Sequence, residues 1–99
     1  MIEVDVTPDT ITVTLIGELD VTTRPMLAER LLPILSTKPR RLVLDMTGTD
    51  FMDCGSARLI ASARRWLPGE ARLVVRRPSR AVRRVLELTG IDAYCEIEG

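Results

Sequence analysis

The residues best suited to chemistry lie together in one stretch, Leu42–Ile60, which reads LVLDMTGTDFMDCGSARLI. An apolar run is followed by three aspartates, two threonines, the thiol of Cys54 and the hydroxyl of Ser56. Hydroxyls can receive a phosphate, a thiol can be oxidised, and the whole set can bind a partner through hydrogen bonds. The stretch holds no pair of a nucleophile and a general base, so we expect binding or modification here rather than bond cleavage.

The absence of histidine removes several classes of catalytic and metal site at once. Ser–His–Asp and Cys–His catalysis, phosphotransfer through histidine and histidine metal ligation are all excluded. The chain also lacks the glycine-rich nucleotide motifs GxxxxGK[ST] and GxGxxG. We therefore expect no enzyme, no metal site and no cofactor.

The net charge is zero, but the charges are unevenly distributed. Residues 1–20 carry five acidic groups and no basic one, whereas residues 58–84 carry nine arginines against Glu70 alone. A basic half can contact nucleic acid or an acidic partner, but arginines spaced along helices more often form a solvated face. We therefore expect no direct contact with nucleic acid.

The length of 99 residues fits a single domain, which we place over residues 1–99. No apolar run approaches the ~20 residues of a membrane span, and the acidic N-terminus does not resemble a secretory signal. Cys54 and Cys95 lie far apart and form no C-x-x-C pair. These features predict a cytoplasmic protein without membrane insertion, as a monomer or weak homodimer.

Hydrophobic periodicity predicts strands that alternate with helices. Ile2–Val6 and Ile11–Leu15 alternate apolar and polar residues around a proline turn, which predicts an antiparallel pair at a sheet edge. Arg41–Met46 is apolar at consecutive positions, which predicts a central strand buried on both faces. Further strands are expected at Ala71–Val75 and Ala93–Ile97. The order ββαβαβαβ predicts an α/β fold with a mostly parallel sheet, an antiparallel edge strand and helices packed on it.

Capping residues mark the expected helix starts: Thr22 or Thr23 for the first helix, Asp53 for the second and Ser79 for the third. Pro33 conflicts with the first helix, so we expect a kink or a change of geometry near Arg30–Leu32. Gly90 stands where a left-handed residue would end the third helix. We expect Trp66 to pack beneath the turn that follows the second helix, and Cys95 to lie in the core.

Three short motifs resemble those of the STAS domain, the fold of bacterial anti-sigma factor antagonists. Residues 17–20 (GELD), 44–53 (LDMTGTDFMD) and 88–91 (LTGI) are similar to family segments that close the second strand, follow the third strand and end the last helix. They occur in the family's order, and the resemblance covers nearly the whole chain. It implies a STAS-type fold.

The resemblance also implies the function of a protein-interaction module. Such antagonists bind an anti-sigma factor that is also a serine kinase, and so release a sigma factor. The kinase phosphorylates a serine in a D-S-S-G segment, which ends binding, and a phosphatase resets the switch. A phosphoserine adds about −1.5 to −2 charges to the interface, so an acidic or apolar partner surface is repelled.

The sequence departs from the family at this phosphoacceptor. Residues 53–56 read DCGS, so Cys54 occupies the acceptor position and cannot be the substrate of a serine kinase. Ser56 is a candidate phosphoacceptor, although a first-turn serine satisfied by the helix cap is the simpler interpretation. Thr47 and Thr49 are weaker candidates. Cys54 itself is either a redox-sensitive thiol or, more simply, a small residue that fits a tight turn.

We expect the partner to bind at the carboxyl ends of the strands, where residues 20–24, residues 47–56 and the exposed face of the second helix meet. The implied partners are an anti-sigma factor serine kinase and, where the switch operates, a phosphatase. The candidate contact residues are Asp20, Thr22, Thr23, Thr47, Thr49, Asp50, Asp53, Gly55 and Arg58.

Two other functions fit parts of the pattern. A STAS subunit of a transporter or of a multi-protein signalling complex would dock constitutively through the same surface, and Cys54 favours this alternative. A phosphoacceptor receiver domain shares the alternation of strands and helices. It needs a lysine after its last strand, however, and Lys38 is the only lysine in the chain.

Overall fold

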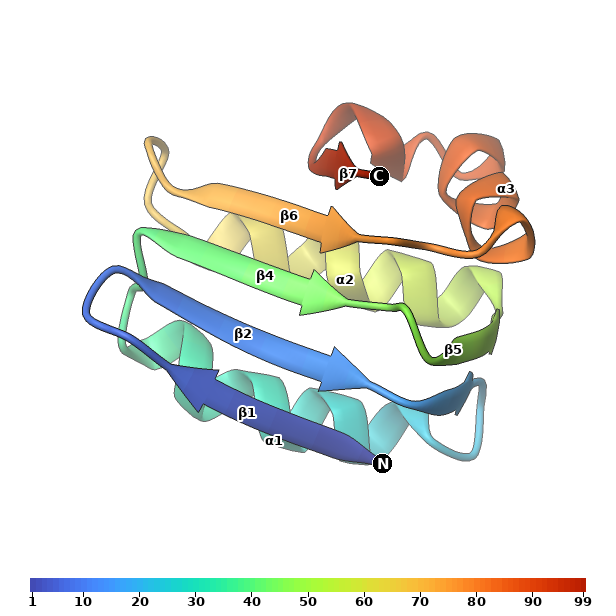
Figure 1. The fold of residues 1–99 in the computed structure, drawn as a ribbon, viewed down its shortest axis with the longest axis horizontal. Coiled ribbons are helices and arrows are strands. Elements are labelled where there is room, and N and C mark those ends of the chain that lie inside the picture. Colours follow the sequence, from blue (N-terminus) through green and yellow to red (C-terminus); the bar gives the residue numbers. More distant parts are fainter.

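The computed structural model describes all residues from Met1 to Gly99 (Figure 1). Its elements are β1 (Ile2–Val6), β2 (Thr10–Leu15), β3 (Gly17–Leu19), α1 (Arg24–Ser36), β4 (Arg41–Asp45), β5 (Thr49–Met52), α2 (Cys54–Trp66), β6 (Arg72–Arg76), α3 (Arg80–Leu88), the 3₁₀ turn η1 (Ile91–Ala93) and β7 (Glu96–Glu98).

Five strands form the main sheet in the order β1-β2-β4-β6-β7. Only β1 and β2 are antiparallel, and every other neighbouring pair is parallel. The strand β4 lies in the middle, as its consecutive apolar residues predict, and Leu42, Val43 and Leu44 are all buried. The expected α/β fold with an antiparallel edge strand is therefore confirmed.

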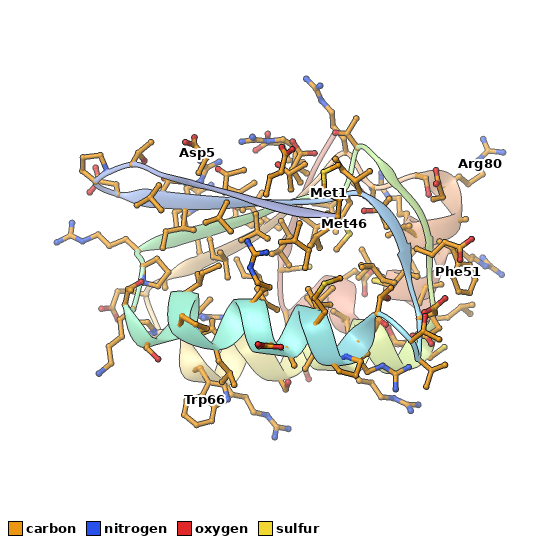
Figure 2. The ribbon with its side chains drawn as sticks, turned by 90° about the horizontal axis from the view of Figure 1, so that it is seen from below. Met1, Asp5, Met46, Phe51, Trp66 and Arg80 are labelled. Atoms are coloured by element: carbon orange, nitrogen blue, oxygen red, sulfur yellow. The ribbon has the colours of Figure 1, made fainter.

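The helices α1 and α2 cover one face of the sheet, and no helix covers the other (Figure 2). Leu42 and Leu44 point into the core beneath these helices. Val43 points to the opposite face of the sheet, which carries a row of charged side chains from β4, β6 and β7, and it is also buried. On this face, ion pairs join β6 to β7, from Arg72 to Glu96 and from Arg76 to Glu98, each at 2.7 Å. Long charged side chains thus bury the apolar centre of a face that lacks a helix.

A second, two-stranded sheet extends from the carboxyl ends of the main strands. In it β3 and β5 pair in parallel, so that Leu19 lies opposite Met52 and both are buried. Gly17 has a φ of +103°, which only glycine adopts readily, and there the chain leaves the direction of β2. From the sequence alone we expect a polar loop from Asp45 to Asp53; the strand β5 within it corrects that expectation.

The helix boundaries follow the capping residues. The carboxylate of Asp53 accepts from Ser56 N–H at 2.7 Å, and the hydroxyl of Ser79 accepts from Val82 N–H at 3.1 Å. Thr23 is the residue before α1, but its side chain does not cap that helix. Gly90 has a φ of +76° after α3, as expected for a left-handed stop.

Two expectations about local structure meet different outcomes. Pro33 lies inside α1, which continues as an α-helix to Ser36, and the expected kink near Arg30–Leu32 stays a prediction. Pro33 and Glu29 are both exposed, so the carbonyl that loses its helical hydrogen bond can bind water. The last strand is Glu96–Glu98 rather than Ala93–Ile97, because the chain first forms the 3₁₀ turn η1 after Gly90. No helix has the length and apolar character that crossing a bilayer requires.

Candidate partner-binding site

The carboxyl ends of β3, β4 and β5 carry most of the predicted site residues, at the right of Figure 1. In open α/β sheets this is the usual place for a binding site, because loops there combine side chains from several strands. Two aspartates, Asp20 after β3 and Asp45 at the end of β4, build the turns that shape this surface.

Asp20 organises the turn that leads into α1. Its Oδ1 accepts from the Thr22 N–H at 3.0 Å, from the Thr22 hydroxyl at 2.7 Å and from the Thr23 N–H at 3.2 Å. The Thr22 hydroxyl is the main cause that holds the pKa of the Asp20 carboxyl below its ordinary value of 3.8. Thr23 in turn donates to the carbonyl of Glu18 at 2.9 Å, so its hydroxyl is committed within the turn.

Asp45 builds a second turn of the same kind. Its Oδ1 accepts from Thr47 N–H at 3.0 Å and from the Thr47 hydroxyl at 2.6 Å. Burial raises the pKa of Asp45, but the two bonds from Thr47 and the charges of Arg76 and Arg77 outweigh it and leave the pKa lowered. Asp45 therefore remains a carboxylate at neutral pH, and the loop to Thr47 is held in one shape.

Asp53 connects the starts of two helices. One carboxylate oxygen caps α2 through Ser56 N–H, and the other accepts from Arg24 Nη2 at 2.8 Å. The bond from Ser56 N–H is the main cause that lowers the pKa of Asp53, and Arg24 lowers it further. Asp53 thus acts as the predicted cap and at the same time pairs with a cation from its own chain.

Arg24 ends the predicted surface segment 20–24, but it was not named among the candidate contact residues. A Cβ atom at Gly55 would overlap its guanidinium, so the absence of a side chain at Gly55 is what lets Arg24 lie across the start of α2. Arg24 is 34 % exposed at its side chain, and Asp53 is 28 % exposed. Gly55 is therefore covered by Arg24 and is a weaker contact residue than expected.

The two candidate phosphoacceptors at this helix start have opposite exposures. Cys54, at the acceptor position, is exposed. Ser56 is 0 % exposed, and its hydroxyl has no hydrogen-bond partner. The interpretation of Ser56 as a displaced phosphoacceptor is corrected by this burial, because the folded chain offers its hydroxyl to no kinase. The simpler interpretation, a first-turn serine at the helix cap, agrees with the bond from Ser56 N–H to the Asp53 carboxylate.

Thr49 is not available to a partner either. It is 2 % exposed, and its hydroxyl donates to the carbonyl of Leu15 at 2.6 Å. Its predicted roles as a contact and as a weaker phosphoacceptor are therefore wrong. Thr49 instead joins β5 to the end of β2.

Two exposed apolar residues lie within the predicted surface but were not named among its contact residues. Phe51 is 47 % exposed on β5, and Val21 is 68 % exposed in the turn after β3. Phe51 lies beside Glu18 in the pairing of β3 with β5, and Figure 2 shows it pointing outward at the end of the molecule. We call the rim the surface formed by Asp20, Val21, Thr22, Arg24, Thr47, Asp50, Phe51, Asp53, Cys54 and Arg58.

The rim is polar at its margin and apolar at Val21 and Phe51, a composition typical of protein interfaces. It brings together Asp20, Thr22, Thr47, Asp50, Asp53 and Arg58 of the predicted contacts. The hydroxyls of Thr49 and Thr23 bond to carbonyl groups of the chain itself, and Gly55 is covered by Arg24. Asp50 and Phe51 are both exposed on β5, between the buried Thr49 and Met52. This pattern is not an alternation of apolar and polar residues, so nothing in the sequence marks Phe51 as exposed.

Trp66 and Cys95 lie outside the rim. Trp66 is 67 % exposed and points away from the sheet in Figure 2, so the expectation that it packs beneath the next turn is wrong. Cys95 is half-buried against the core, and burial raises the pKa of its thiol to about 11. At neutral pH it is a thiol with little reactivity.

A family model named STAS domain matches residues 1–98 of the chain. The chain belongs to the STAS domain family. The match spans the rim and every element that supports it, so the resemblance drawn from the three motifs is confirmed.

Solved structures with the same fold include several anti-sigma factor antagonists. One from Mycobacterium paratuberculosis has a TM-score of 0.92 and 24% identity, with 99% of this chain and 84% of that chain covered. The antagonist SpoIIAA in its unphosphorylated form has a TM-score of 0.84 and 20% identity, with coverage of 100% and 89%.

SpoIIAA from Bacillus has also been solved in its phosphorylated form, with a TM-score of 0.75, 20% identity and coverage of 100% and 92%. That antagonist is therefore a phosphoprotein in one of its states. A search of curated proteins finds no match to this chain. At these identities the likeness establishes that the STAS fold is shared, including the strands and helices that carry the rim.

Proposed function

We propose that this STAS domain is an anti-sigma factor antagonist that acts by binding and not by catalysis. In this proposal the rim binds an anti-sigma factor serine kinase in the cytoplasm, and that binding releases a sigma factor. The observation that carries the proposal is the rim itself: two exposed apolar side chains, Val21 and Phe51, surrounded by fixed polar groups at the carboxyl ends of the strands.

The turns at Asp20 and Asp45 support a binding role because they hold the polar margin of the rim rigid. Each aspartate accepts two bonds from the threonine two residues later, so little conformational freedom is left to lose when a partner docks. The antagonists with the same fold support the choice of partner.

In the proposal, serine phosphorylation does not control binding at the rim. The exposed residue at the acceptor position is Cys54, and the neighbouring hydroxyl of Ser56 is buried. Thr47 is exposed, but its hydroxyl already donates to Asp45. A phosphatase therefore has no substrate at this helix start, and binding depends on the concentrations of the chain and its partner.

The same observation supports a second function, that of a constitutive docking subunit. A STAS domain of a transporter or signalling complex would use the rim in the same way, and an unswitched surface suits permanent docking. The partner distinguishes the two functions. One is an ATP-binding anti-sigma factor, and the other is a subunit of a permease or signalling assembly.

The test is a binding screen by isothermal calorimetry. The full chain is titrated into each ATP-binding anti-sigma factor encoded in the same genome, with ADP and with ATP. The proposal expects saturable one-to-one binding to one of them and release of its sigma factor. No complex with any of them, under either nucleotide, would contradict the proposal and favour the docking subunit.

A further inference from the structure

The outer edge of β1 carries backbone groups without a partner. Met1 and Ile16 exchange two hydrogen bonds, and Thr7 N–H donates to the carbonyl of Thr10. In an antiparallel pair such bonded positions recur at every second residue, so Met1, Glu3, Asp5 and Thr7 face β2. The N–H and C=O groups of Ile2, Val4 and Val6 therefore point outward, where a further strand can bind them.

The side chains along this edge are apolar on one face. Val4 is 38 % exposed and Val6 is 66 % exposed, although both point to the helix side of the sheet. From Val6 a hollow of ≈ 420 Å³ continues between the turn after β1 and the end of α1, lined also by Pro8, Pro33 and Ile34. An added strand would bury its own apolar side chains here.

The opposite face of the same edge is acidic. Glu3 and Asp5 are exposed and form no ion pair, and Asp9 in the following turn has none either. A second copy of this chain would bring Glu3 and Asp5 against the same acids, and like charges across a strand pair are unfavourable. The charges therefore select against self-pairing and favour a basic strand.

We propose that β1 is a second docking surface, which adds a strand from another protein whose residues alternate between basic and apolar. Main-chain hydrogen bonds to Ile2, Val4 and Val6 would provide the pairing, Glu3 and Asp5 would bind the basic side chains, and Val4 and Val6 would contact the apolar ones. The turn between β1 and β2, whose residues line the hollow, lies at the end of the sheet opposite the rim (Figure 1). This inference does not rest on the proposed function.

The probe is a capped peptide of sequence KVRVKV, titrated into the full ¹⁵N-labelled chain and followed by NMR and amide hydrogen exchange. We expect shifts along β1, and slowed exchange of the outward amides of Ile2, Val4 and Val6. The peptide EVEVEV is the matched control, and we expect it to bind at least about tenfold more weakly because its charges repel Glu3 and Asp5.

Two variants sharpen the test. Val4→Pro removes one outward N–H and leaves the bonds to β2 intact, so it should abolish the protection, whereas Val4→Thr keeps the N–H and should bind. Glu3→Lys with Asp5→Lys changes only exposed side chains and should reverse the preference between the two peptides.

Three results would overturn the inference. One is the absence of shifts along β1 with KVRVKV up to about 1 mM, the weak end of specific binding. Another is equal binding of both peptides, which would show no selection by charge. The third is concentration-dependent protection of Val4 and Val6 in the free chain, which would make a second copy the occupant.

Discussion

Arg24 donates from Nη2 to Asp53 Oδ2 at 2.8 Å, and its guanidinium fills the space that a side chain at Gly55 would need. The start of α1 is thereby joined to the start of α2 at the centre of the rim. Because the pair is only partly buried, we expect it to fix the geometry of the rim more than to stabilise the fold.

The first prediction concerns the coupling between Arg24 and Gly55. Alanine is preferred over glycine inside a helix by about 0.8–1 kcal/mol, but Gly55→Ala forces Arg24 away from Asp53. In the native background we therefore expect little net change in the free energy of unfolding. In the Arg24→Ala background, Gly55→Ala should stabilise by about 1 kcal/mol, as measured by urea unfolding.

The matched control places Gly55→Ala in the background of Arg65→Ala, which removes an exposed arginine of α2 that forms no ion pair. There the change at Gly55 should behave as it does in the native chain. Equal stabilisation in all three backgrounds would show that Arg24 does not occupy the space over Gly55.

The second prediction concerns stability in acid. Asp53 has a pKa below its ordinary value of 3.8, so its contribution is present above about pH 4 and is lost as the pH falls through the lowered pKa. Asp53→Asn keeps a side chain that can cap α2 but removes the charge. Thermal unfolding followed between pH 2 and pH 6 should therefore lose less stability on acidification in this variant.

Glu29→Gln serves as the control for this measurement, because Glu29 is exposed and takes part in no hydrogen bond or ion pair of its side chain. This variant should lose as much stability between pH 6 and pH 2 as the native chain does. If Asp53→Asn lost as much stability on acidification as the native chain, neither the cap nor Arg24 would favour the charged carboxylate.

The third prediction concerns the apolar part of the rim. Phe51→Ala removes an exposed aromatic side chain, so the fold should remain stable while binding of the anti-sigma factor weakens by about 2 kcal/mol, roughly 30-fold. Trp66→Ala removes a more exposed aromatic on the helix side, away from the rim, and should bind as the native chain does. The reverse order of effects in calorimetry would place the interface on the helices.

The fourth prediction concerns phosphorylation. Incubation with the cognate kinase and ATP should add no phosphate to the native chain, because Cys54 stands at the acceptor position and Ser56 is buried. Cys54→Ser places a hydroxyl at the exposed position and should gain one phosphate by intact mass. A phosphate on the native chain that disappears in Ser56→Ala would contradict this, since α2 would then have to open.

Much of the fold could be read from the sequence because it depends on local periodicity. The alternation in β1 and β2 and the consecutive apolar residues of β4 each specify how a strand is buried. The caps at Asp53 and Ser79 depend on hydrogen bonds over three residues, so they were also predictable.

The parts that were missed depend on contacts between distant segments. The pairing of β3 with β5 joins short segments about thirty residues apart, and neither has a periodicity long enough to mark it as a strand. That pairing buries Thr49 and exposes Phe51. The packing of the two helix starts buries Ser56 and brings Arg24 to Asp53. Polar residue types alone predicted exposure for Thr49 and Ser56, and tertiary packing reversed it.

The most direct test of the account is hydrogen–deuterium exchange of the full chain, alone and in complex with the anti-sigma factor found in the binding screen. We predict that protection on binding covers Asp20–Arg24, Thr47–Asp53 and the first turn of α2. The amides around Trp66 and those of the main sheet, whose open face no helix covers, should be unaffected. Protection of the open face or of the C-terminal half of α2, with the rim unchanged, would contradict the claim that the rim is the partner-binding surface.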